Sequence, residues 1–198
     1  MALAEKTIIE FGCGFGTWGH IIRSRVDQGG DKAYMVGCDI YRHYLQNLRT
    51  YNPYDDLVRC DARYLPFKKD CAHFVFAFEI TEHLNKRDGQ KFLTDLPTLA
   101  SEVVVSMPYG YFEQEEIRGN RNEKHLASWE RQDLVALGYT AEKTGLAMDI
   151  ENTTKKYHLY DLYHLARKKH RCDWAGAMLI GTYVKTGNEQ CRAPRKKP

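Results

Sequence analysis

The amino-acid sequence predicts an α/β fold in which helices cover both faces of a doubly wound, mostly parallel sheet. Short apolar runs rich in β-branched residues alternate with segments of helical periodicity along the 198-residue chain. The apolar runs lack the polar/apolar alternation of half-exposed strands, which is typical of parallel strands buried on both sides. A glycine-rich turn directly follows the first run, as in sheets that bind a ligand at their carboxyl edge.

The predicted elements follow one another in chain order. Strands are expected at residues 7–12, 33–40, 57–62, 71–79 and 102–108. Helices are expected at 16–27, 41–53 and 85–100; Asn52 and Pro53 should stop the second, and the third should end near Pro97.

The alternating pattern lapses after residue 108. The segment 109–127 reads as a long loop, called here the lid loop, since loops of this length in a compact domain are usually functional or disordered. A helix is expected at 128–138, with Ser128 as its N-cap and Gly138 just past its end. A strand at 139–146, an inserted aromatic-rich helix at about 155–170 and a last strand at 177–185 follow. We expect one domain over residues 1–187 and a basic tail at 188–198.

Composition excludes several classes of protein. No apolar run approaches the ~20 residues of a membrane helix, and no charged-then-apolar leader opens the sequence, so we expect a cytoplasmic protein without membrane contact. The six cysteines form no C-x-x-C pair and no zinc-like spacing with histidine, so we expect no metal and no disulfide framework. The net charge of +3 is weak, and its basic runs suit solvated faces or tails.

The residues around the glycine turn indicate a ligand. Gly12, Gly14 and Gly16 follow a predicted strand and open a predicted helix, so another group can approach their backbone closely. Position 17 is threonine, so the G-x-G-x-x-G fingerprint of dinucleotide-binding proteins is not met. Glu10 before the turn favours a cationic ligand. Asp39, at the end of the second strand, can accept hydrogen bonds from both hydroxyls of a ribose.

Three runs of sequence carry a resemblance to a known family. They are EFGCGFG at 10–16, GCDIY at 37–41 and RCDARYLPFKKDCAHFVFAFEITEHL at 59–84. Together they resemble the class I S-adenosylmethionine-dependent methyltransferases, most closely the type 11-like branch. The resemblance implies a seven-stranded, Rossmann-like sheet whose last strand is antiparallel. It also implies S-adenosylmethionine as the cofactor.

The resemblance further implies roles for particular residues. Glu10 and the loop Gly12–Gly16, including Cys13 and Gly14, would face the methionine part of the cofactor. Asp39 would bind the ribose hydroxyls, with Ile40 packed on the adenine. The edge of the adenine would be read by Asp61 and the Ala62 backbone, and Glu79 would border the methyl-transfer centre. The family usually carries helices before the first strand, where this sequence has MALAEK. Either the chain is a fragment or its pocket is covered from elsewhere.

The lid loop resembles that of a subset of the same family. The matching positions that we expect to contact substrate or form the lid are Pro108, Tyr109, Gln114, Asn120 and Trp129. A turn role beside Gly119 is also open for Asn120. The leading candidate for a general base is His125, followed by His83 and Glu79.

Several functions stay open on the sequence alone. The favoured function is a methyltransferase acting on a small hydroxyl-, carboxyl- or sugar-type acceptor. An RNA methyltransferase is the weaker alternative, because only the basic runs favour nucleic acid and no Asn/Asp-Pro-Pro-aromatic motif follows the fourth strand. A non-catalytic cofactor-binding subunit is another alternative. The helix at 155–170 could cover the pocket or form a homodimer face.

Overall fold

The computed structural model describes residues 6–30, 32–110, 113–144 and 178–185. The predicted helix at 155–170 and the predicted tail at 188–198 lie outside these residues. The strands are β1 Lys6–Phe11, β2 Ala33–Asp39, β3 Asp56–Arg59, β4 Ala72–Phe78, β5 Ala100–Pro108, β6 Thr140–Thr144 and β7 Met178–Val184. The helices are α1 Thr17–Gln28, α2 Arg42–Asn47, α3 Lys86–Leu99 and α4 Arg131–Ala136, with short 3₁₀ turns η1 Thr81–His83 and η2 Arg121–Glu123.

The strands form a single seven-stranded sheet in the order β3-β2-β1-β4-β5-β7-β6. The pairs among β1 to β5 are all parallel, whereas β7 runs antiparallel to both β5 and β6. This confirms the predicted fold class, including the antiparallel last strand. The chain therefore leaves β1 toward one edge and returns to β4 on its other side, which opens a crevice at the carboxyl ends of these strands.

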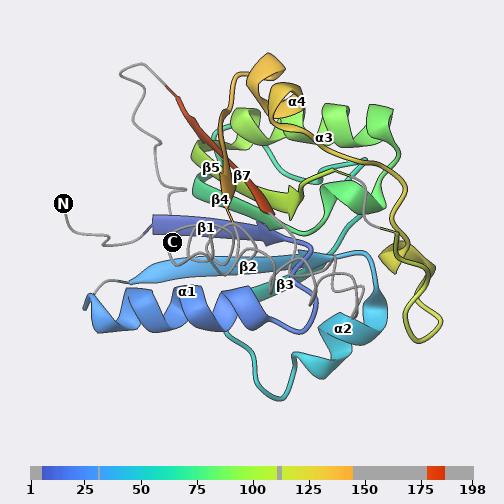
Figure 1. Cartoon of the computed structure of the whole chain (residues 1–198). Coiled ribbons are helices and arrows are strands. Elements are labelled where there is room, and N and C mark those ends of the chain that lie inside the picture. Colours follow the sequence, from blue (N-terminus) through green and yellow to red (C-terminus); the bar gives the residue numbers. More distant parts are fainter. Residues whose placement is uncertain (1–5, 31, 111–112, 145–177, 186–198) are drawn as a thin grey trace, which may run out of the picture.

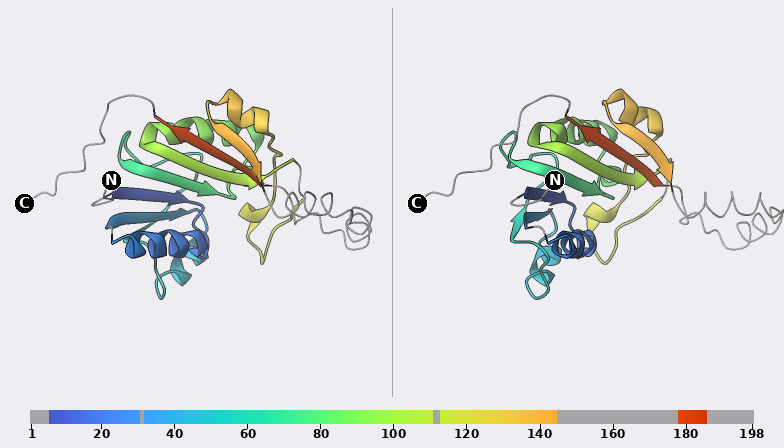
Figure 2. Two further views of the ribbon diagram at one scale, coloured as in Figure 1. Left: turned by 60° about the vertical axis from the view of Figure 1, so that its left-hand side comes forward. Right: turned by 90° about the vertical axis from the view of Figure 1, so that its left-hand side faces the viewer.

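Helices cover both faces of the sheet, so its strands are buried from two sides. Figure 1 and Figure 2 show α1 and α2 on one face and α3 and α4 on the opposite face. Consecutive residues of β1 accordingly belong to different cores: Ile9 and Phe11 pack in the larger cluster with residues of α3, and Ile8 packs in the smaller one with Val26 of α1. Of the apolar residues Trp18, Ile21, Ile22 and Val26 of α1, only Val26 is buried.

Helix α3 ends at Leu99, within the predicted range and two residues beyond Pro97, so the proline lies inside the helix. A proline inside a helix has no N–H to donate to the carbonyl four residues earlier, which here is that of Leu93. The hydroxyl of Tyr139 donates to this carbonyl instead, at 2.7 Å. A side chain from a distant segment thus replaces the missing helical bond.

The predicted boundaries of α4 and α2 needed correction. Glu130, and not Ser128, caps α4: its side chain accepts from the backbone N–H of Asp133, whose own side chain accepts from the N–H of Glu130. Helix α2 ends at Asn47, ahead of Asn52, and Asn52 instead forms a turn in which its side chain accepts from the Tyr54 N–H. None of the helices within the described ranges combines the length and apolar character that a membrane span requires.

Candidate functional site

A cavity of about 670 Å³ lies at the carboxyl ends of β1 to β4. This volume is in the range of ~300–1,000 Å³ that is typical of sites for small molecules and cofactors. Its wall includes the glycine turn after β1, the ends of β2 and β3, the segment after β4 and residues of the lid loop. Figure 2 shows the lid loop at the edge of the sheet to which the arrowheads of the parallel strands point.

The glycine turn is strained in a way that requires glycine. Gly12, Gly14 and Gly16 all have positive φ, of 69°, 50° and 79°. At Gly16 a Cβ would also lie 2.7 Å from a methyl group of Leu48, so a side chain has no room. The turn therefore brings bare backbone to the cavity, with Gly12, Cys13 and Gly14 in its wall, whereas Gly16 packs behind it against Leu48, which follows α2.

Asp39 holds the glycine turn and also faces the cavity. One carboxylate oxygen accepts from the Gly14 N–H at 2.9 Å, and the other accepts from the Tyr41 N–H at 2.7 Å. Burial raises the pKa of Asp39, and these two N–H donors oppose the rise. Each carboxylate oxygen has a second lone pair, so Asp39 can still accept hydrogen bonds from a ligand. Ile40 lies beside it in the wall.

Asp61 lines the cavity at the end of the next strand, but Arg63 engages its carboxylate. The guanidinium of Arg63 bonds to both oxygens, and its backbone N–H bonds to one of them. These bonds lower the pKa of Asp61, so it is ionised at neutral pH. Ala62 also lines the cavity. A ligand amino group read by Asp61 would share the carboxylate with Arg63.

Glu10 lies away from the cavity wall. Its side chain is 2% exposed, and its Oε2 accepts from the hydroxyl of Tyr54 at 2.9 Å. Burial raises its pKa from 4.5 to about 7, while the bond from Tyr54 opposes the rise. The predicted direct contact with a cationic ligand is therefore replaced by a buried carboxyl that supports the sheet beneath the glycine turn.

The raised pKa of Glu10 predicts a pH-dependent stability. The folded state holds the Glu10 proton more tightly than the unfolded state, so this contribution is full below pH 4.5 and falls as pH rises through about 7. Between pH 5 and pH 8 the loss should be ~2–3 kcal/mol, from a shift of this size at 1.36 kcal/mol per unit. Glu10→Gln keeps an acceptor for Tyr54 but cannot ionise. The free energy of unfolding of Glu10→Gln minus that of wild type should therefore grow by ~2–3 kcal/mol between pH 5 and pH 8. Urea denaturation at each pH measures this difference.

The matched control is Glu102→Gln, which changes an exposed carboxyl at β5. This variant should follow the wild-type pH profile. Parallel profiles for Glu10→Gln and wild type would contradict the raised pKa of Glu10.

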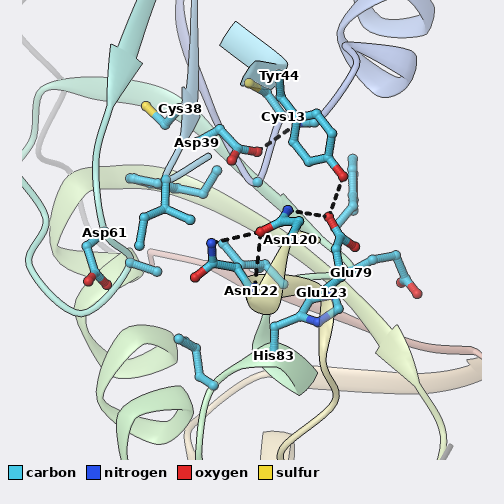
Figure 3. Close-up of a pocket in the computed structure, with 18 of the residues that line it drawn as sticks. Cys13, Cys38, Asp39, Tyr44, Asp61, Glu79, His83, Asn120, Asn122 and Glu123 are labelled. Atoms are coloured by element: carbon cyan, nitrogen blue, oxygen red, sulfur yellow. Dashed lines mark hydrogen bonds between the residues drawn. The ribbon is translucent and has the colours of Figure 1, made fainter. Parts of the chain in front are cut away.

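Glu79 follows β4 in an unusual backbone conformation. Its φ is 53°, in the left-handed region that non-glycine residues seldom adopt and that clusters at functional sites. Ser106 of β5 holds it twice: the Ser106 carbonyl accepts from the Glu79 N–H at 2.9 Å, and the Ser106 hydroxyl donates to its carboxylate at 2.8 Å. Partial removal from water raises the pKa of Glu79, against the hydrogen bonds from Ser106 and Glu82. The strained turn directs Glu79 into the cavity (Figure 3).

Of the two candidate histidines, one reaches the cavity. His83 lines it, whereas His125 is buried behind, with the two rings packed edge to face at 4.8 Å between centroids. Burial, and next the neighbouring His125, lower the pKa of His83, so its imidazole is neutral at pH 7. Beside them is the buried Glu82, whose pKa burial raises well above its ordinary value.

The lid loop crosses to α2 over the cavity. Tyr44 donates from its hydroxyl to Glu123 at 2.7 Å, and the Asn120 side chain donates to the same carboxylate oxygen at 3.1 Å (Figure 3). Asn120 is 2% exposed and caps η2 by accepting from the Asn122 N–H. Asn120 thus has the turn role left open by the sequence, and it also lines the cavity.

Several residues expected at the lid do not line the cavity. The side-chain amide of Gln114 donates to the backbone carbonyl of Glu123, and the backbone carbonyl of Gln114 accepts from the backbone N–H of His125. Gln114 therefore joins parts of the lid loop to one another. Pro108 ends β5, and Tyr109 packs under the Lys143 ammonium at 4.1 Å. Trp129 is fully buried in the core.

Other residues of the wall were not predicted from the sequence. Those with side chains suited to contact a ligand are Phe15, Trp18, Tyr44, Cys60, Phe78, Asn122 and Glu123. Trp18 of α1 packs on Phe78 of β4, with 4.8 Å between ring centroids. Exposed aromatic residues directly after a glycine turn are the one signal that could have indicated this pair.

Comparisons with known proteins agree with this fold. Residues 8–100 match a protein family described as a methyltransferase domain. A putative methyltransferase from Bacillus halodurans C-125 has a similar solved structure: TM-score 0.57, 15% identity, 91% of this chain and 93% of that chain covered. A second similar structure is a chain of the complex between the Haloferax volcanii Trm112 methyltransferase activator and the putative methyltransferase. Its TM-score is 0.58 and its identity is 15%, and the alignment covers 93% of this chain and 85% of that chain.

A third similar structure contains a bound ligand. It is Haemonchus contortus phosphoethanolamine N-methyltransferase 2 in complex with S-adenosyl-L-methionine, with a TM-score of 0.57 and 14% identity. The alignment covers 93% of this chain but 49% of that one, so the present chain spans about half its length. The comparison with curated proteins found no match.

The fold, the crevice at its carboxyl edge and the match of residues 8–100 to a methyltransferase-domain family agree with the class I methyltransferases. The family resemblance predicted from the sequence is thereby confirmed, and the type 11-like branch is consistent with it.

Proposed function

We propose that this chain binds S-adenosylmethionine in the cavity and transfers its methyl group to a small acceptor of hydroxyl, carboxyl or sugar type. The observation that carries the proposal is the cavity itself, which joins the glycine turn, Asp39 and Glu79 at one edge of a methyltransferase domain. Asp39 is placed to accept from ribose hydroxyls. Cavity-facing Glu79 is placed to border the sulfonium, since a carboxylate there favours a cation.

The charge of the cavity wall favours a small acceptor over RNA. Its carboxylates are those of Asp39, Asp61, Glu79, Asp88 and Glu123, against the guanidinium groups of Arg63 and Arg121. Arg63 is already paired with Asp61. Binding to nucleic acid depends on neutralising phosphates with lysine and arginine, so a wall rich in carboxylates disfavours it.

The protein's part in methyl transfer is mainly alignment, because the cofactor supplies the leaving group. Correct placement of the reacting groups can contribute ~7–11 kcal/mol, whereas a general base adds about 10²–10⁴-fold. Of the predicted bases, Glu79 and His83 line the cavity, and a neutral His83 can accept a proton from an acceptor hydroxyl. His125 lies behind His83 and would act through it.

Calorimetry with S-adenosylmethionine and S-adenosylhomocysteine tests the cofactor half of the proposal. We expect saturable binding of one molecule per chain. Incubation with methyl-labelled cofactor and small-metabolite extracts then tests transfer, with RNA as the comparison acceptor. Label in a small-molecule fraction is expected. Label in RNA would show instead that the acceptor is RNA. Binding with no transfer to either would favour a non-catalytic subunit, and no binding would overturn the proposal.

A further inference from the structure

A cluster of metal-ligating side chains lies at the inner wall of the cavity, formed by Glu82, His83 and His125. A carboxylate oxygen of Glu82 and one ring nitrogen from each histidine lie within 4.8 Å of one another. An ion held by such atoms at ~2.0–2.2 Å needs them roughly 3–4 Å apart. Small rotations of the side chains therefore bring all three atoms onto one ion.

Glu82 gives an independent indication of a missing ligand. The side chain is 2% exposed, and its Oε2 has no hydrogen-bond partner among the described residues. The residue is held in place, because its backbone carbonyl accepts from the N–H groups of Leu126 and Ala127. A buried carboxylate oxygen without a partner is rare in folded proteins, and a bound ion would satisfy it.

The surrounding charges also favour a cation. The side chains of Glu79 and Glu82 are within hydrogen-bond contact, and Glu123 adds a third acidic group nearby. Among the described residues, no ion pair joins a lysine or arginine to any of these three carboxyl groups. The cluster therefore concentrates acidic groups that no ion pair within this part of the chain balances.

One ring nitrogen of His83 contacts the backbone. Its Nδ1 lies 3.3 Å from the backbone carbonyl oxygen of Lys124. If Nδ1 carries the proton and donates it to this oxygen, Nε2 has a free lone pair. Histidine ligands in metalloproteins commonly donate their second ring N–H to a carbonyl or carboxylate in this way, which fixes the tautomer and the ring.

We propose that Glu82, His83 and His125 bind one first-row divalent transition-metal ion, of which Zn²⁺ and Mn²⁺ are the representative cases. Two imidazoles and one carboxylate suit these ions, whereas Mg²⁺ and Ca²⁺ prefer a set of oxygen ligands. No spacing in the sequence indicated such a site, because His125 is separated from the Glu82–His83 pair by the whole of α3 and β5.

The place of the site indicates what the ion would do. His83 and Glu79 both line the cavity, so an ion bound by His83 would lie beside it. Such an ion would take an oxygen donor of the acceptor as a further ligand, which would orient the oxygen and lower its pKa. Glu79 would then be the base, because both ring nitrogens of His83 would be engaged. This consequence rests on the proposed methyl transfer, whereas binding of the ion does not.

Metal binding is measured on the full chain without a histidine tag, stripped with EDTA and free of cofactor. We expect saturable binding of one Zn²⁺ per chain by calorimetry and a rise in the melting temperature. Co²⁺ should give a visible absorption band of imidazole–carboxylate coordination, which Zn²⁺ displaces. Failure to detect saturable binding of Zn²⁺, Mn²⁺ and Co²⁺ would overturn the proposal.

Two variants and a matched control assign the ligands. Glu82→Gln preserves volume, and His83→Gln changes a half-buried residue, so at least one should fold, as circular dichroism will show. Each should weaken Zn²⁺ binding by more than the ~10–100-fold typical of groups that only orient ligands. His20→Gln, on the exposed side of α1, should bind like wild type. Unchanged affinity in a folded Glu82→Gln or His83→Gln variant would place the ion elsewhere.

Cofactor calorimetry on the same proteins separates this proposal from the proposed function. Glu82→Gln should bind S-adenosylhomocysteine with wild-type affinity, because Glu82 does not line the cavity. Metal binding without cofactor binding would sustain the metal site and overturn the methyltransferase proposal. Cofactor binding without metal binding would overturn the metal site and leave the methyltransferase proposal standing.

Discussion

Asp39→Ala should weaken binding of S-adenosylmethionine by at least ~100-fold, or about 3 kcal/mol. Hydrogen bonds to charged groups contribute roughly 1.5–3 kcal/mol each, and Asp39 is placed to receive two from ribose. The substitution also removes the acceptor of the Gly14 and Tyr41 N–H groups, at 2.9 and 2.7 Å, so the glycine turn loses its anchor. Calorimetry with wild type and variant measures the ratio of dissociation constants.

Two controls define the origin of this loss. Asp39→Asn keeps an oxygen acceptor and the side-chain volume but removes the charge. Its affinity for the cofactor should therefore lie between those of wild type and Asp39→Ala. Asp27→Ala removes an exposed carboxylate at the end of α1 and should leave the affinity unchanged. Full affinity in a folded Asp39→Ala protein would show that the ribose lies elsewhere.

Trp129→Ala should lower the free energy of unfolding by ~3–5 kcal/mol, as for other buried aromatic residues cut to alanine. The side chain is 0% exposed. Its ring fits the space left by Gly89, where a Cβ would lie 2.5 Å from the ring, and the Lys86 ammonium lies 4.0 Å from the ring centroid. Its carbonyl accepts from the Gly110 N–H, which joins the end of the lid loop to its beginning. Chemical denaturation followed by circular dichroism measures the loss.

The indole nitrogen provides a matched comparison. Nε1 of Trp129 is buried and has no hydrogen-bond partner among the described residues. Trp129→Phe removes this unpaired N–H and keeps an aromatic ring, so it should cost less than ~1.5 kcal/mol, the usual limit for swaps that largely conserve volume. Trp18→Ala, at a side chain that is 44% exposed, should cost about 1 kcal/mol or less. Similar losses for all three variants would contradict Trp129 as the anchor.

The strands were largely predictable from the sequence, because a strand that is buried on both faces appears as an unbroken apolar run. β4 and β5 show this most clearly. A boundary set by a distant side chain was not predictable. The Tyr139 hydroxyl that lets α3 pass Pro97 depends on the folded structure and leaves no clear pattern in the sequence. The start of α4 was missed for another reason: Ser128 is also a preferred N-cap residue, and it lies two positions before Glu130, which pairs with Asp133.

The candidate site divides in the same way. Asp39, Asp61 and Glu79 were predictable because each follows or ends a strand at the same edge of the sheet. Tyr44 and Glu123 were not, since residues of these types are common on any surface and only the folded chain brings them to 2.7 Å. Glu10 differs from these residues: its position suggested a ligand contact, whereas its carboxyl accepts from Tyr54 and does not line the cavity.

The segment that roofs the cavity lies beyond the part of the chain that matches the methyltransferase family. The match ends at residue 100, whereas Ile117, Asn120–Glu123 and Leu126 belong to the wall. The cofactor edge and the roof are thus separate stretches of polypeptide joined at β5. Under the proposed function, an engineered chain could therefore exchange the roof, and with it the contacts to the acceptor, without changing the strand ends and the glycine turn.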